Sequence, residues 1–124
     1  MDIDGKLRPL YLLKILKERT DEDHTLTTAQ LCKMLKEEFG VETFRTTIKG
    51  DIEVLQQAGF SVQVTRSTQN LYNYIERDFD IPEVKLLIDA VMSSKFITKA
   101  KSDQLVSKLT ELAGPYKARE LKRN

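Results

Sequence analysis

The stretch of sequence that decides the fold runs from Leu26 to Tyr74. It reads LTTAQLCKMLKEEFG (26–40), VETFRTTIKGDIEVLQQAG (41–59) and FSVQVTRSTQNLYNY (60–74). Thr27 and Gln30 match a capping box, in which two side chains satisfy free backbone N–H groups at a helix start. Gly40 suits the left-handed residue that ends such a helix. A short helix is therefore predicted first, with a signal at each end.

A second short helix is predicted over 43–58 after a tight turn. Thr43 is expected to cap it, and Gly59 closes it. An apolar residue recurs at spacings of four, four and three, which places the set on one buried face of a helix. The set consists of Phe44, Ile48, Ile52 and Leu55. Two short helices joined by a tight turn are typical of a helix-turn-helix.

The hydrophobic period then changes from about four residues to two. Val62 and Val64 alternate with polar residues, and Tyr72 and Tyr74 alternate again after a turn-like segment at 66–70. This pattern predicts a β-hairpin over 60–75, with a loop of about five residues. The predicted fold is mainly α (α+β): a winged helix-turn-helix with a two-stranded β-wing, followed by a helical hairpin.

The flanking segments complete the predicted organisation. A helix is expected over 6–19 with Pro9 in its first turn, followed by an exposed polar loop at 20–24. Pro82 is expected at the first position of another helix, and Thr98 caps a partner helix that runs to Tyr116. Residues 1–76 are thus the predicted DNA-binding domain, and residues 77–124 form a helical linker or dimerisation segment.

The helical hairpin carries more apolar surface than a small domain needs for cover. Its inward residues are Val84, Leu87, Ile88, Val91, Leu105, Leu109 and Leu112. These side chains could pack on the domain before them, or they could join two copies of the chain. We expect a mixture of the two, and therefore a homodimer.

The charge of the chain is close to neutral. Among 124 residues the formal net charge is +1, with ten Lys or Arg against eleven Asp or Glu in 1–75 and ten against eight in 76–124. A strong nucleic-acid binder usually has a clearer basic footprint. Any DNA binding must therefore depend on a few well-placed groups or on dimer avidity. The single cysteine and the lack of a long apolar run favour a cytoplasmic protein and no membrane partner.

The second helix of a helix-turn-helix enters the major groove of double-stranded DNA. Its expected contacts, with those of the first helix and the hairpin, are Thr28, Thr43, Arg45, Thr46, Thr47, Lys49, Gly50, Glu53 and Arg66. Arg and Lys suit guanine or phosphate, Glu suits the cytosine amino group, and hydroxyls at helix starts suit phosphate. The alternative is an ordinary solvated face. Gly50 fits either close approach of DNA or a tolerated substitution.

Catalytic chemistry is not expected. His24 adjoins Asp21, Glu22 and Asp23, but the cluster lacks a recognised metal-ligand spacing. Cys32 lies next to an apolar stripe and is expected to pack there. There is no glycine-rich phosphate loop and no nucleophile elbow. We therefore predict that the protein is not an enzyme and that it has no catalytic residue, metal or cofactor.

The sequence resembles the N-terminal part of the DeoR-type regulators that join a winged helix to a C-terminal WYL domain. The matching segments are 10–16, 26–27, 47–48, 51–55 and 58–60, the tyrosines Tyr72 and Tyr74, and the linker segments 82–91 and 93–98. The linker segments are the most specific part of the match. The resemblance implies sequence-specific DNA binding, usually as a homodimer, with any effector ligand bound by the WYL domain.

The resemblance also has departures. A WYL domain is expected after about Asn124, so the chain looks like an excised N-terminal fragment or a truncated relative. Thr46 and Gly50 stand where relatives commonly carry arginine, and Lys49 stands where they carry an aromatic residue. Fewer arginines mean fewer phosphate contacts. The alternative function is therefore a winged-helix protein–protein interaction module with no specific DNA binding.

Overall fold

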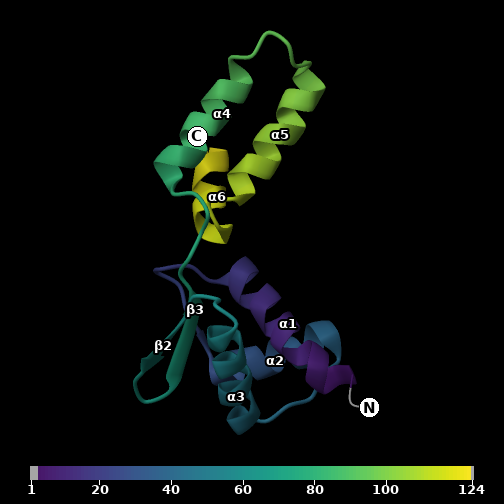
Figure 1. Cartoon of the computed structure of the whole chain (residues 1–124), viewed down its shortest axis with the longest axis vertical. Helices are drawn as coiled ribbons and strands as arrows, with labels where there is room; N and C mark the ends of the chain where they lie inside the picture. Colours follow the sequence, from purple (N-terminus) through teal and green to yellow (C-terminus); the bar gives the residue numbers. More distant parts are fainter. Residues whose placement is uncertain (1–2, 124) are drawn as a thin grey trace. The chain divides into compact units, whose positions relative to one another are not determined.

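The computed structural model describes residues 3–123, and the chain divides into two compact units, 1–76 (unit 1) and 77–124 (unit 2). The elements of unit 1 are α1 (Ile3–Arg19), β1 (Leu26–Thr27), α2 (Thr28–Phe39), α3 (Arg45–Gln57), β2 (Val62–Arg66) and β3 (Asn70–Tyr74), and those of unit 2 are α4 (Ile81–Met92), α5 (Lys99–Glu111) and α6 (Pro115–Arg123) (Figure 1). The predicted mainly helical α+β class is confirmed. None of the described helices is long and apolar enough to cross a bilayer.

The core of unit 1 lies between α1, α2, α3 and the sheet. Its buried residues are Leu12, Ile15, Leu16, Leu26, Leu31, Leu35, Val41, Ile48, Ile52, Leu55, Val62, Tyr72 and Tyr74. Three of the four residues predicted for the buried face of α3 are in this list. Phe44 is not, because it is the extended N-cap residue (φ −111°, ψ 157°) and its side chain is 79% exposed. The prediction for Phe44 was wrong because the helical period does not extend past the cap.

Helix α2 begins and ends as predicted. The Thr27 hydroxyl accepts from the Gln30 N–H at 3.1 Å, and the Gln30 side-chain oxygen accepts from the Thr27 N–H at 2.8 Å. Gly40 ends the helix in the left-handed conformation, with φ 67°. The cap predicted for α3 was wrong, since Thr43 precedes the N-cap and α3 has no side-chain cap.

The sheet has three strands in the order β1-β3-β2, and all pairs are antiparallel. The predicted two-stranded hairpin was therefore incomplete, because β1 sets Leu26 opposite Tyr72. A two-residue strand is too short to show a period. The hairpin loop is also shorter than predicted: Arg66 pairs with Asn70, so only residues 67–69 form the turn.

Helix α1 begins earlier than predicted and holds Pro9 in its interior. An internal proline removes one hydrogen bond and costs about 3 kcal/mol. The helix also buries Leu12, Ile15 and Leu16 completely or nearly so. Full burial of one such side chain contributes about 1.5–3 kcal/mol, so packing outweighs the cost of the proline.

The segment after α1 is exposed only in part: residues 22–24 are exposed as predicted, whereas its first two residues are not. Thr20 and Asp21 are buried. The Thr20 hydroxyl donates to the Leu16 carbonyl and accepts from the Tyr74 N–H at 2.9 Å. The Asn73 amide donates to the Asp21 carbonyl at 2.9 Å. These polar side chains join the end of α1 to β3 and are structural.

Unit 2 contains the two helices of the predicted hairpin and a third helix over the helix-like basic run at its end. Helices α4 and α5 contact each other and run in opposite directions (Figure 1). Asp80 and Glu83 form a capping box at the start of α4, and Thr98 caps α5 as predicted. Gly114 then adopts φ 92°, so the chain turns and Tyr116 belongs to α6 instead of α5. A glycine before a proline marks this break in the sequence.

Candidate functional site

A shallow hollow on unit 1 brings together the start of α2, the first half of α3 and the hairpin turn. It is lined by Thr28, Ala29, Arg45, Thr46, Lys49, Thr68, Gln69, Asn70 and Tyr72, and we call it the donor hollow. The lining holds two cations, several hydroxyls and two amides, with no carboxylate. Its polar side chains are thus suited to an anionic ligand.

A second hollow continues between α3 and the hairpin. Its lining consists of Lys49, Ile52, Glu53, Gln56, Val64, Arg66, Asn70 and Tyr72, and we call it the hairpin hollow. The Gln56 amide donates to the Val62 carbonyl at 2.9 Å, which holds α3 to β2. Lys49 lines both hollows, and Glu53 is the one carboxylate in either lining. The two hollows share Lys49, Asn70 and Tyr72 and therefore adjoin each other.

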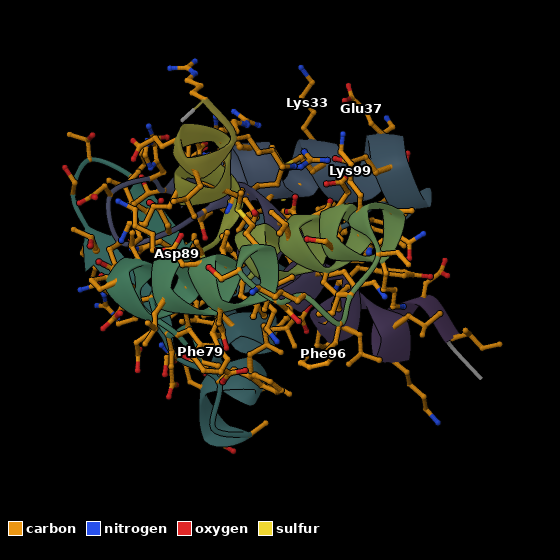
Figure 2. The ribbon with its side chains drawn as sticks, turned by 90° about the horizontal axis from the view of Figure 1, so that it is seen from above. Lys33, Glu37, Phe79, Asp89, Phe96 and Lys99 are labelled. Atoms are coloured by element: carbon orange, nitrogen blue, oxygen red, sulfur yellow. The ribbon has the colours of Figure 1, made fainter. Side chains whose placement is uncertain are left out.

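Five of the ten cations of unit 1 are paired with a carboxylate. The pairs are Arg8–Asp51, Lys14–Glu18, Arg19–Glu38, Lys33–Glu37 and Lys36–Glu42. Lys33 and Glu37 project from the same side of α2 (Figure 2). In contrast, Arg45, Lys49 and Arg66 form no ion pair within residues 3–123. Three cations of unit 1 without an ion pair among the described residues therefore lie around the two hollows.

The structure brings together six of the nine predicted DNA contacts. Thr28, Arg45, Thr46 and Lys49 line the donor hollow, while Glu53 and Arg66 join Lys49 in the hairpin hollow. The remaining three, Thr43, Thr47 and Gly50, line neither hollow.

Two of these three have environments of their own. Thr43 lines a different hollow with Cys32 and Phe44, and its hydroxyl is buried without a hydrogen-bond partner in the described part of the chain. It is therefore displaced from the predicted helix start. Gly50 is exposed, and a Cβ atom there would meet nothing within 4 Å. No packing within unit 1 requires a glycine at this position.

The sequence reasoning missed the hydroxyl of Tyr72. The alternation of the strand indicated a buried ring, and the side chain is indeed buried. The period gives no partner for the hydroxyl, which accepts from the Thr28 hydroxyl at 3.5 Å and from the Asn70 amide at 3.4 Å. Tyr72 thus connects the start of α2 with the hairpin.

The ion pair that holds α3 against α1 was also missed. The Arg8 Nε and Nη2 atoms both donate to the Asp51 carboxylate, the second at 3.3 Å. Both side chains are mostly buried, at 17% and 11% exposed. A bidentate pair of this kind fixes orientation as well as distance. It therefore helps to set the direction in which α3 presents Arg45 and Lys49.

The histidine and the cysteine have surroundings that suit structural roles. Burial raises the pKa of the Cys32 thiol, against the opposing charge of Arg45, so the reactive thiolate is disfavoured. His24 Nδ1 lies 2.7 Å from the Asp21 Oδ1. Among residues 3–123, no three His, Cys, Asp or Glu side chains form a group that could hold a metal ion.

The predicted dimerisation residues are only partly available in unit 2. Val84 is fully buried in the single chain, and its contact with a second copy stays a prediction. Leu87, Ile88, Val91, Leu105, Leu109 and Leu112 are half-buried. The more exposed apolar residues are Leu86 (70%), Met92 (66%) and Phe96 (100%), the last in the loop between α4 and α5 (Figure 2). The predicted inward residues thus lie mainly between α4 and α5.

No protein-family model matches the sequence, and no curated protein or solved structure gives a significant match. The resemblance to DeoR-type regulators therefore stays a prediction that rests on the residues quoted above.

Proposed function

We propose that unit 1 is a winged helix-turn-helix that binds double-stranded DNA. Helix α3 enters the major groove, and the β2–β3 hairpin is the wing on the backbone or in the minor groove. The observation that carries this proposal is the position of Arg45, Lys49 and Arg66. These unneutralised cations surround two hollows that are otherwise lined mainly by neutral groups.

The net charge of unit 1 is negative, but this does not exclude DNA binding, because the cations proposed to bind DNA lie close together. Unit 1 carries ten Lys or Arg against twelve Asp or Glu. Exposed charges farther apart than about 10 Å are largely screened at 0.1 M salt. Acids paired elsewhere on the unit therefore weaken the local attraction for phosphate much less than the sum of charges suggests.

Each side chain has a role that fits its chemistry. Arg45 can bind guanine with two hydrogen bonds, and Glu53 can accept from the cytosine amino group. Lys49 and Arg66 supply phosphate contacts. Helix α3 lacks a side-chain cap, so the N–H groups of its first turn also favour an anion.

Selection from a randomised DNA library, followed by titration at several salt concentrations, tests the proposal. We expect one preferred sequence whose affinity falls with salt. Arg45→Ala should weaken the preference, and Lys49→Ala should lower the salt slope by about 0.9. Lys14→Ala is the matched control, because it removes the same charge from a cation paired with Glu18.

The proposal fails if the chain, shown to be folded and dimeric, prefers no DNA sequence over random DNA at low salt. It also fails if Lys14→Ala weakens binding as much as Lys49→Ala, since the attraction would then be diffuse.

The second candidate function is a winged-helix module that binds another protein. Two exposed apolar side chains favour it: Phe44 is 79% and Val54 54% exposed. Under this alternative, Phe44→Ser abolishes capture of a purified partner and the library yields no preferred DNA. Under the leading proposal, Phe44→Ser leaves the DNA affinity unchanged because Phe44 lines neither of the two hollows.

We further propose that the chain is the N-terminal part of a cytoplasmic transcription regulator of the type it resembles. It acts as a homodimer joined through unit 2, has no enzymatic activity and binds any effector in a following WYL domain. The coding sequence beyond Asn124 tests the last point. A continuation with β-rich periodicity supports it, and an immediate stop codon contradicts it.

A further inference from the structure

The pairing of β1 with β3 places the start of α2 beside a buried tyrosine. Leu26 lies opposite Tyr72 and Thr27 opposite Leu71, so Thr28 follows directly at the head of α2. The Tyr72 side chain is 2% exposed and lines the donor hollow together with Thr28 and Asn70. A sheet contact therefore brings two hydroxyls and an amide to one point of the hollow.

A count of protons shows an unused donor at this point. The hydroxyls of Thr28 and Tyr72 carry two protons, and the bond between them uses one. The Asn70 amide donates and so uses neither. No acceptor for the second proton occurs among the hydrogen bonds of residues 3–123. The contacts of 3.5 and 3.4 Å are also long. Among these hydrogen bonds the Tyr72 hydroxyl is only an acceptor, so its own proton is available to a ligand.

The surrounding charges favour an anion as the acceptor. Arg45 and Lys49 line the same hollow, and no carboxylate does. The hollow measures about 280 Å³. One water needs roughly 15 Å³ by this measure, so a group of several heavy atoms fits.

We propose that the donor hollow holds one phosphodiester group of the DNA backbone, with the Tyr72–Thr28 hydroxyl pair as a neutral donor to its oxygen. This inference rests on the DNA binding proposed above and specifies one contact within it. Tyr72 binds the phosphate and also fixes the hairpin relative to the start of α2. A phosphate held at this point sets the register of the protein on the duplex, while base contacts specify the sequence.

A neutral donor has a different signature from a cation. Loss of a lysine contact lowers the salt slope because one phosphate is no longer neutralised. Loss of the hydroxyl removes a hydrogen bond but no charge. Tyr72→Phe should therefore weaken preferred and random DNA by the same factor, about tenfold, with the salt slope unchanged.

The decisive experiment combines this variant with a backbone scan of the selected duplex. Each phosphate in turn is replaced by an uncharged methylphosphonate, and affinity is measured for the wild-type chain, Tyr72→Phe and Thr28→Val. Tyr11→Phe is the matched control, because it removes a tyrosine hydroxyl from α1, where the ring stacks on Phe39. We expect one backbone position whose replacement costs the wild-type chain about tenfold and costs Tyr72→Phe much less.

The outcomes separate the two proposals. If the wild-type chain binds but no position couples to Tyr72→Phe or Thr28→Val, the phosphate site is overturned and DNA binding stands. If the wild-type chain selects no DNA, both proposals fail. Thr28→Val keeps the test valid if Tyr72→Phe unfolds, because its side chain is only half-buried. A fall in Tyr11→Phe affinity equal to that of Tyr72→Phe also overturns the site.

Discussion

The two units bury very different amounts of apolar side chain. Unit 1 encloses a contiguous core that includes Leu16 and Ile48, both fully buried. In unit 2 the buried apolar residues are Val84, Ala113 and Ala118, and alanine contributes little burial. Unit 2 also leaves Leu86 70% exposed. The difference indicates that unit 1 is stabilised by a larger core of its own, whereas the core of unit 2 is thin.

Deletion of residues 77–124 should have the largest effect of the changes that test this difference between the units. We expect the remaining 76 residues to fold and to be monomeric, because the apolar surface proposed for dimerisation lies in unit 2. Light scattering should show the mass of a single 76-residue chain, less than one third of the mass of the full-length dimer of two 124-residue chains, with native circular dichroism. An unchanged dimer would place the interface in unit 1, and an unfolded fragment would show that the core of unit 1 is insufficient.

Replacement of leucine by alanine should affect the two units unequally. Leu16→Ala removes a fully buried side chain from unit 1 and should cost about 2–5 kcal/mol of unfolding free energy. Leu86→Ala removes an exposed side chain from unit 2 and should stay within about 0.5 kcal/mol in the monomer. Urea titration of both variants measures the difference. Equal losses would mean that Leu86 is covered, either within one chain or by the second copy of a dimer.

Ion pairs should follow the same division. Asp51→Asn leaves the largely buried Arg8 without its carboxylate, and loss of a buried partner costs about 3 kcal/mol. In unit 2, Glu111→Gln breaks the exposed pair with Lys122, which is worth less than about 1 kcal/mol. If urea titration shows similar losses of unfolding free energy for both variants, the Arg8–Asp51 pair stabilises unit 1 no more than an exposed ion pair would.

The sequence predicted the elements whose signals are local. The capping box of Thr27 and Gln30, the left-handed Gly40 and the cap at Thr98 are each read from a few neighbouring residues, and all three are confirmed. The face of α3 was predicted as far as the helical period holds, from Ile48 to Leu55. Phe44 was misplaced because it lies one residue outside that period.

The features that were missed depend on residues distant in the chain. Strand β1 exists because Leu26 pairs with Tyr72, which no period within two residues can reveal. The Arg8–Asp51 pair spans 43 positions. Polar residues such as Thr20 were expected in an exposed loop, yet their hydrogen bonds to β3 place them in the interior. The candidate site was therefore predicted as a set of helix positions, without the tyrosine that joins its parts.

Glycine replacements should have opposite signs in the two units. Gly50→Ala in α3 should stabilise unit 1 by about 1 kcal/mol, because alanine favours the helix and its Cβ meets nothing within 4 Å. Gly114→Ala should destabilise unit 2 by at least about 1 kcal/mol, since φ is 92° and the Cβ would lie 2.9 Å from the Arg77 Nε. Thermal unfolding measures both shifts.

The same Gly50→Ala variant resolves the reason for that glycine. If DNA approaches the backbone of α3 closely, affinity falls although stability rises. An unchanged affinity leaves Gly50 as a tolerated substitution. A loss of stability in Gly50→Ala would instead contradict the open environment of this position in unit 1.

Acid should produce the smallest effect, and it should appear in unit 1. Burial raises the pKa of Asp21, but hydrogen bonds from the His24 ring and the Asp23 N–H outweigh it and leave the pKa below its usual 3.8. Because the folded pKa is the lower one, this carboxylate stabilises the fold above about pH 3.8, and the contribution is lost as pH falls through the folded value.

Replacement of the histidine tests this origin of the acid sensitivity. His24→Ala should raise the Asp21 pKa towards its ordinary value, measured by NMR titration of the carboxyl carbon. The stability of unit 1 should then depend less steeply on pH in this range. Asp21 and its partners hold the segment that joins α1 to β3, so amide exchange in acid should accelerate first at residues 20–24 and at Tyr74. Exchange that begins instead throughout unit 2 would show that its thinner core sets the acid limit of the chain.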